Sequence, residues 1–98
     1  MPVVVAIIEV RRSELAAFRE FEAGAAAIMR QHGGAIEKTV VVDEGDAETF
    51  TEIHFVRFPD AAAYAAYRSS PLLAGLQPLR NAAVVATELH VGEDGPAY

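Results

Sequence analysis

A run of β-branched residues near the N-terminus constrains the fold more than any other feature. Residues 3–10 read VVVAIIEV, with apolar side chains at every position up to Glu9. Because successive side chains of a strand point to opposite faces, this run predicts a strand that is covered on both faces. It is too short to span a bilayer, and Arg11 and Arg12 follow it rather than precede it. We therefore expect neither a membrane span nor a signal peptide here.

An amphipathic helix is predicted over residues 13–32. Apolar side chains recur at steps of three and four, which places them on one stripe of a helix. These side chains belong to Leu15, Phe18, Phe21, Ala25 and Ile28. The charged residues of the segment, Arg19 and Glu22 among them, are predicted to lie mostly on the other side. Ser13 is expected to cap the helix and Gly33-Gly34 to end it, since glycine adopts the left-handed conformation at no steric cost.

Three more strands are predicted, at residues 35–42, 49–58 and 83–91. The polar residues 43–46 connect the first two as a hairpin. A tail is expected at residues 92–98.

The second helical region is predicted to be interrupted. Asp60 and Ser70 are placed to cap two helical segments, and Pro78 predicts that the second segment is kinked or restarts. Its leucines, Leu72 among them, are expected on the buried side. The resulting β-α-β-β-α-β order is the ferredoxin-like α+β arrangement, in which both helices lie on one face of an antiparallel sheet. We expect a single domain over residues 1–98.

The second face of the sheet then needs a cover. Residues 3–8 and 40–42 are apolar at successive positions, so both faces are apolar near the middle of the sheet. Hydrophobic residues make up 52% of the 98, but 19 of them are alanine, which leaves a thin core for a monomer. We therefore predict a homodimer in which two sheets pack face to face.

Charge and cysteine content exclude several classes of function. The net charge of −6 argues against a nucleic-acid partner. The absence of cysteine excludes a disulfide framework, a thiolate metal site and a cysteine nucleophile. It also suits a reducing compartment, so a cytoplasmic location is expected. The isolated pair Gly33-Gly34 lacks the strand–loop–helix context of a phosphate-binding loop, and no cofactor is predicted.

One segment carries a resemblance to a known group of proteins. Residues 55–83 read FVRFPDAAAYAAYRSSPLLAGLQPLRNAA, with F-P-D at 58–60 and S-S-P-L-L at 69–73. With the element order, this resembles the dimeric α+β barrel superfamily, and in particular a domain-of-unknown-function branch beside the antibiotic-biosynthesis-monooxygenase-like proteins. The resemblance implies a dimeric barrel fold that hosts oxygenases, isomerases and haem-degrading enzymes. The cofactor-free oxygenases and haem degraders typically use an Asn among Trp residues. This chain has no Trp and only Asn81, which counts against those two activities.

Glu52 and His54 are the best candidates for chemistry. Alternation puts both on one face of the predicted third strand, together with Val56 and Phe58. A carboxylate beside an imidazole can orient a general base, so His54 is the candidate base and Glu52 its orienting partner. The alternative is a half-buried polar pair with solvent or backbone partners.

Glu88 and His90 repeat this spacing on the last strand, which raises the possibility of a metal shared with the first pair. The usual strand order separates the two pairs by a strand, about 9–10 Å, so we predict no metal site. His32 is interpreted as a residue of the last helical turn, where the helix dipole favours it.

Tyr64, Tyr67 and Arg68 are predicted on the first short segment as wall residues at a pocket mouth, with Arg68 able to meet an anionic group. Arg57 faces away from His54 and is expected to pair with Glu9 or Glu37. Three functions stay open: a cofactor-independent oxygenase or isomerase acting on a small, partly apolar metabolite, a binding module without turnover, and a non-catalytic structural dimer.

Overall fold

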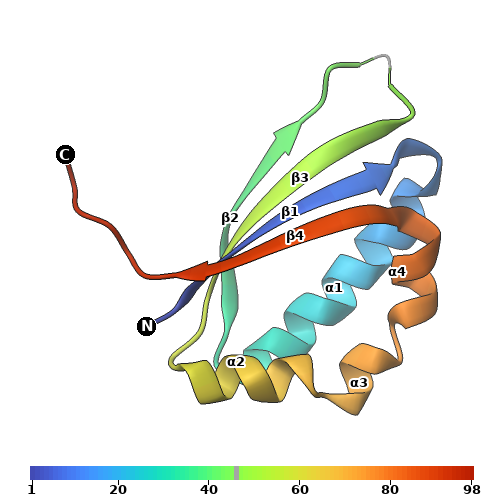
Figure 1. Ribbon diagram of the computed structural model, residues 1–98. Helices are drawn as coiled ribbons and strands as arrows, with labels where there is room; N and C mark the ends of the chain where they lie inside the picture. Colours follow the sequence, from blue (N-terminus) through green and yellow to red (C-terminus); the bar gives the residue numbers. More distant parts are fainter. Residues whose placement is uncertain (46) are drawn as a thin grey trace.

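The computed structural model describes residues 1–45 and 47–98, and it confirms the predicted α+β architecture (Figure 1). Four antiparallel strands form one sheet in the order β2-β3-β1-β4, so the apolar N-terminal strand lies inside the sheet. The elements are β1 (Val3–Arg11), η1 (Arg12–Glu14), α1 (Leu15–Gln31), β2 (Ala35–Val42), β3 (Thr49–Arg57), α2 (Ala61–Arg68), α3 (Pro71–Ala74), α4 (Gln77–Ala83) and β4 (Val84–Gly92).

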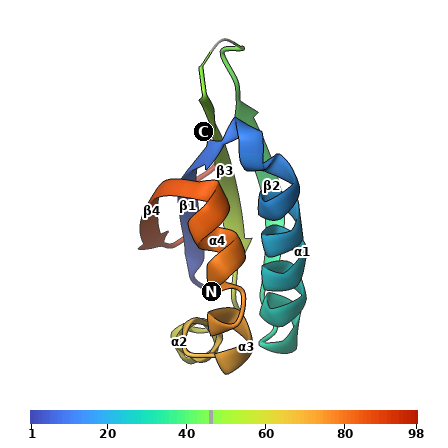
Figure 2. The same cartoon turned by 90° about the vertical axis from the view of Figure 1, so that its right-hand side faces the viewer.

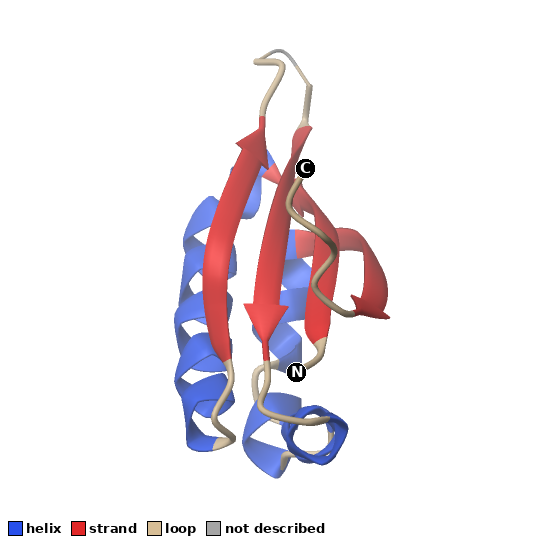
Figure 3. Cartoon of the chain, turned by 90° about the vertical axis from the view of Figure 1, so that its left-hand side faces the viewer, coloured by secondary structure: helices blue, strands red, loops and turns tan. Residues whose placement is uncertain are grey.

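The helices form a single layer on one face of the sheet. Helix α4 packs beside α1, and both lie over the strands (Figure 2). Figure 3 shows the opposite face, which we call the open face; none of the described helices covers it. Its centre is apolar, because Val5 pairs with Phe55 and Ile7 pairs with Ile53, and all four side chains are partly exposed.

Along β3, buried residues alternate with partly buried ones, which identifies the inner face of the sheet, the face that lies against the helices. Every second residue from Phe50 to Val56 is buried against the helices, and the residues between them are only partly buried. Phe18, Phe50 and Val10 belong to the apolar cluster at one end of this face. Phe58 and Val56 belong to the cluster at the other end. The polar side chains of β3 therefore lie between two apolar clusters.

The start of α1 differs from the prediction. The helix begins at Leu15, and Ser13 lies in the preceding 3-10 turn without capping it. Arg12 provides the reason, since its guanidinium holds Asp43 at 2.7 and 2.8 Å and the carbonyl of Ala47 at 2.9 Å. These contacts fix the turn between β1 and α1 through tertiary structure rather than through a local cap.

The end of α1 is as predicted. Gly33 has a φ of +76°, and the backbone N–H groups of Gly33 and Gly34 donate to Arg30 and Met29, which completes a Schellman motif. His32 is the C-cap residue, at the helix end where the sequence placed it. The predicted hairpin at residues 43–46 is described only up to Gly45, because Asp46 lies outside the described residues.

The second helical region is broken as expected. Asp60 accepts from the N–H of Ala63 at 2.7 Å, and Ser70 caps α3 in the same way. Pro78 lies in the first turn of α4, where its missing N–H costs nothing. The prediction for Leu72 is wrong: it is exposed, because the four-residue α3 does not reach the sheet with that side.

The predicted strand ends agree with the structure to within one residue, and β2 has the predicted bounds. Since Gly92 still belongs to β4, the tail starts one residue later than predicted. Among the described helices, none is long and apolar enough to cross a membrane.

Candidate functional site

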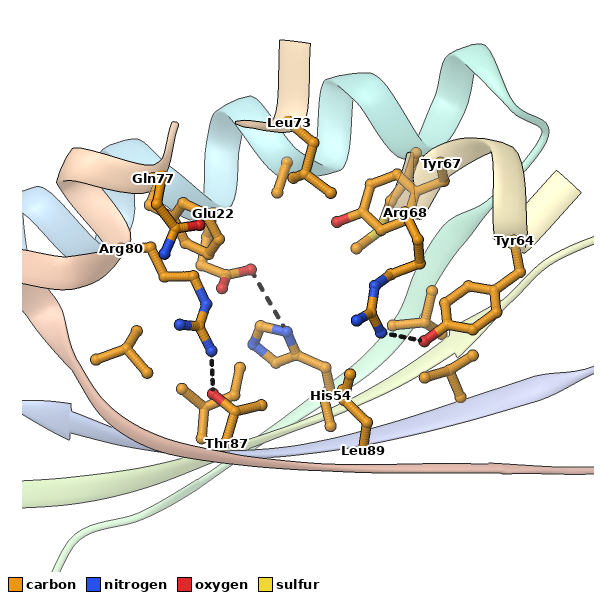
Figure 4. Close-up of a pocket in the computed structure, with 18 of the residues that line it drawn as sticks. Glu22, His54, Tyr64, Tyr67, Arg68, Leu73, Gln77, Arg80, Thr87 and Leu89 are labelled. Carbon is orange, nitrogen blue, oxygen red and sulfur yellow. Dashed lines mark hydrogen bonds and ion pairs between the residues drawn. The ribbon is translucent and has the colours of Figure 1, made fainter. Parts of the chain in front are cut away.

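A cavity of about 520 Å³ lies between the inner face of the sheet and the helices (Figure 4). Its walls are largely apolar and come from β1, β3, β4 and all four α-helices. The charged or titratable side chains that line it, tyrosines apart, are Glu22, His54, Arg68 and Arg80. We call this cavity the inner pocket.

Glu52 and His54 lie side by side on β3, as alternation predicted. Nε2 of His54 is 2.8 Å from Oε1 of Glu52, and the two residues are 3% and 2% exposed. The pair is therefore fully buried rather than half-buried, and side chains of α1 are its partners rather than solvent or backbone. Glu52 does not line the inner pocket, whereas the ring of His54 does. The imidazole thus separates the Glu52 carboxylate from the cavity.

Arg19 holds the Glu52 carboxylate that contacts His54. Its Nη1 donates to both carboxylate oxygens of Glu52, at 2.9 and 3.1 Å. A carboxylate held by a guanidinium is ionised and can act only as a hydrogen-bond acceptor. Nε2 of His54 therefore carries the hydrogen of this contact and donates a hydrogen bond to Glu52. In the neutral ring the lone pair then sits on Nδ1. The Arg19–Glu52 pair therefore fixes both the orientation and the tautomer of His54.

Glu22 meets the other side of the ring. Its Oε2 is 3.5 Å from Nδ1 of His54, an ion-pair separation rather than a short hydrogen bond, and its side chain is 14% exposed. Burial raises the pKa of the Glu22 carboxyl above its ordinary value, while His54 acts in the opposite direction. The Glu22 carboxylate and Nδ1 of His54 thus face each other at the wall of the inner pocket. Such a pair can take a proton from, or return it to, a molecule in the inner pocket.

The predicted wall residues gather at the end formed by α2. The ring of Phe58 packs against those of both Tyr64 and Tyr67, with centroid distances of 5.3 and 5.4 Å. Arg68 donates to the Tyr64 hydroxyl at 2.9 Å and lies over the same ring. Burial raises the pKa of Tyr67 to about 12, so its hydroxyl stays protonated near neutral pH. The structure brings these three predicted residues together with His54 around one cavity.

Arg80 provides a second cation at the end of the pocket formed by α4 and β4. Its Nη2 donates to Oγ1 of Thr87 at 2.8 Å. Both residues line the inner pocket, and both are partly buried.

The second Glu-x-His pair does not join this site. Glu88 and His90 pair with Ile7 and Val5 of β1, which puts them on the open face, whereas Glu52 and His54 lie on the inner face. Both residues are exposed and lie 3.4 Å apart. Within residues 1–45 and 47–98, no group of three or more His, Cys, Asp or Glu side chains is arranged so that it could hold a metal ion.

Arg57 also lies outside the site. It pairs with Glu37, one of its two predicted partners, and with Asp94 at 2.7 and 2.8 Å. Asp94 comes from the tail and was not predicted. The other predicted partner, Glu9, instead accepts a hydrogen bond from Thr49 at 3.2 Å.

Sequence reasoning missed three residues of this arrangement, namely Glu22, Arg19 and Arg80. Glu22 was assigned to the solvent side of α1, but it lies four residues after Phe18 and three before Ala25, which are both buried. That spacing is the signal that would have placed it on the inner side. Arg80 and Thr87 are separated by a strand boundary, so no spacing in the sequence indicates their contact.

The family follows from a match over most of the chain. Residues 4–92 match the model of a domain of unknown function, DUF1330. The chain belongs to the DUF1330 family. The match covers all four strands and the whole inner pocket of this DUF1330 domain. No functionally curated protein matches the sequence.

Solved structures place the DUF1330 domain in a wider fold group. A protein of unknown function from Rhodopseudomonas palustris has a TM-score of 0.79 at 14% identity, covering 98% of this chain and 84% of the other. SnoaB, a cofactor-independent oxygenase from Streptomyces nogalater, has a TM-score of 0.71 at 16% identity, covering 98% and 95%. A putative antibiotic biosynthesis monooxygenase from Nitrosomonas europaea has a TM-score of 0.69 at 13% identity, with both chains covered completely. These likenesses establish the shared ferredoxin-like fold and agree with the resemblance found in residues 55–83.

Proposed function

We propose that this DUF1330 domain binds a compact, partly apolar small molecule in the inner pocket. The observation that carries the proposal is a cavity of about 520 Å³ whose apolar walls surround the Glu22–His54 pair. Ligand sites are typically concave, mostly apolar and fitted with a few convergent polar groups. Tyr64, Tyr67 and Arg68 act in this proposal as the residues that hold the ligand at the α2 end.

A thermal-shift screen with a metabolite library tests the pocket. Ligands of the folded state raise the melting temperature by mass action. Ala74→Trp fills the pocket from α3, and Ala62→Trp, on an exposed position of α2 outside the pocket, is its matched control. We expect hits that stabilise the wild type and the Ala62→Trp variant but not the Ala74→Trp variant. A screen in which no compound distinguishes the two variants would leave the structural dimer as the better description.

A second candidate function is proton transfer without a cofactor, as in an isomerase or a cofactor-independent oxygenase. It is favoured by the connected groups Arg19, Glu52, His54 and Glu22, which orient one imidazole toward the pocket. His54 is the proposed base, and Glu52 is the proposed orienting residue.

Deuterium exchange tests this candidate on any ligand that the screen finds. The wild type in D₂O should exchange an acidic C–H of the ligand, and His54→Gln should lose the exchange while still binding the ligand. A wild type that binds its ligand and exchanges no proton would point to a binding module without turnover. Equal exchange in the His54→Gln variant would remove His54 from the role of base.

We also propose that the domain is a homodimer through the open face. The support is the apolar centre formed by Val5, Ile7, Ile53 and Phe55, which the chain leaves partly exposed. Ile53→Glu should give a monomer in sedimentation velocity experiments. Val41→Glu is the control, since Val41 is exposed but pairs with Glu52 and so belongs to the inner side of the sheet. A wild type that sediments as a monomer at micromolar concentration would refute the dimer.

A further inference from the structure

The charge of the inner pocket is opposite to the charge of the chain. The sequence carries a net charge of −6, but two of its eight basic residues, Arg68 and Arg80, line this one cavity. The neutral oxygens of Tyr64 and Thr87 accept from these guanidiniums. Within residues 1–45 and 47–98, neither guanidinium lies within 4.0 Å of a carboxylate oxygen. Each of them keeps donors available for an anion.

The acidic groups of the site offset only part of this positive charge. Glu52 is compensated by Arg19 and is screened from the cavity by His54. Glu22 is the one carboxyl among the described lining residues; burial raises its pKa, whereas His54, Arg19 and Arg80 lower it. The low-polarity walls strengthen the attraction of the partly buried Arg80 for an anion, because they reduce screening by water, whereas the exposed Arg68 is screened more strongly.

The two guanidiniums lie at opposite ends of the pocket. Figure 4 shows Arg80 at the end formed by α4 and β4 and Arg68 at the end formed by α2, with Glu22 and His54 between them. Figure 4 shows Leu73 over this middle section, and its side chain offers no hydrogen bonds to a polar ligand. The order along the pocket is therefore a cation, a middle section that contains Leu73 and the facing side chains of Glu22 and His54, and a second cation.

From this arrangement we infer that the ligand is a compact dianion, with one acidic group bound by Arg80, the other bound by Arg68, and an apolar segment lying against Glu22 and His54. A small dicarboxylic acid is the simplest compound of this class. Each carboxylate fits the planar fork of a guanidinium, which can bind it through two hydrogen bonds. The inference rests on the proposed small-molecule site and specifies its substrate class.

Calorimetric titration with a graded set of probes tests the inference. The probes are the straight-chain dicarboxylates from succinate to suberate, the monocarboxylate of each length and the diamide of each length. We expect at least one dicarboxylate to bind about tenfold or more tightly than its monocarboxylate, and more tightly still than its diamide, which is the loss expected per charge-assisted contact.

Variants at the two ends then assign the contacts. Arg68→Gln and Arg80→Gln should each reduce dicarboxylate affinity to that of the monocarboxylate, whereas Arg30→Gln, an exposed change on α1 outside the pocket, should not. Arg80→Lys keeps the charge and should retain part of the affinity. Circular dichroism of each variant shows whether it is folded before its affinity is interpreted.

The outcomes separate this inference from the proposed function. If diamides or other neutral library compounds bind in the pocket as tightly as dicarboxylates, the pocket stands and the dianion is refuted. The same holds if the Arg68→Gln and Arg80→Gln variants bind dicarboxylates as the wild type does. If neither these probes nor any library compound binds, the proposed site fails together with the inference.

Discussion

Replacing Arg19 by glutamine should destabilise the domain, although Arg19 itself is half exposed. The reason lies in Glu52, which is 2% exposed and has its carboxylate held by Nη1 of Arg19 at 2.9 and 3.1 Å. Without the guanidinium, the N–H of His54 is the one partner that residues 1–45 and 47–98 supply to this buried carboxylate. A buried charge that loses its counterion costs far more than a surface pair is worth.

The size of the effect follows from the exposure of the two partners. Breaking a fully buried pair costs about 3–5 kcal/mol, and breaking an exposed pair costs about 0–1 kcal/mol. Since the side chains of Arg19 and Glu52 are 51% and 3% exposed, water replaces part of the lost interaction, and we expect about 2 kcal/mol. For a domain of this size that corresponds to a fall in melting temperature of about 8–16 °C.

A double-mutant cycle in urea denaturation isolates the pair. Glu52→Gln should be mild, because Gln still accepts from His54 and the solvent can hydrate the released Arg19. In the Glu52→Gln background the cost of Arg19→Gln should fall by about 1–2 kcal/mol. The reference variant is Arg30→Gln, an exposed change in the last turn of α1 that should cost only a few tenths of a kcal/mol. A cost equal to that of Arg30→Gln, or the same cost in both backgrounds, would refute the reasoning.

Two further predictions concern Glu22 and Gly34. Because burial raises the pKa of Glu22, the unfolded chain releases this proton first as the pH rises from about 4, and the folded state loses stability from there up to the folded pKa. Glu22→Gln should therefore match the wild type near pH 4 and exceed it in urea midpoint at neutral pH; a difference that does not vary with pH would contradict this. Gly34→Ala should cost about 1–3 kcal/mol, since its Cβ would lie 2.7 Å from two ring carbons of the fully buried Phe58. Gly24→Ala, which meets only the flexible end of Leu76, should cost less in the same thermal melts.

The parts of the fold that could be predicted are those that local patterns determine. The β-branched run of β1, the glycines after α1 and the oxygens of Asp60 and Ser70 each act within a few residues of their own position. Ser13 shows where this reasoning fails. It has the residue type of a cap, but the contacts of Arg12 with residues more than thirty positions away determine the turn.

The residues of the site also fall into those that a local pattern predicts and those that it does not. Glu52 and His54 were predicted from a strand period of two, which assigns faces without knowledge of any partner. The helix period predicted an apolar stripe on α1, but it did not predict which residues lie on the most buried line of that stripe. Leu15 was placed on the buried stripe and is 40% exposed, whereas Glu22 was placed outside it and contacts His54. The spacing of Glu22 from Phe18 and Ala25 indicates the buried side of α1, but its partner cannot be recognised from that segment, because His54 lies on β3.

The position of this polar cluster is also an argument about its role. Glu22, Glu52 and His54 lie between the two apolar clusters of a chain with little core to spare, beside a cavity that leaves part of its lining without packing partners. Apolar residues at these three positions would fill the gap and avoid the desolvation of charge, and such replacements are often neutral or stabilising. A domain that served only as a structural dimer would need the open face and would gain nothing from this inner arrangement. The two proposals thus assign different tasks to the two faces of the sheet: we propose association through the open face, and ligand binding or proton transfer at the inner one.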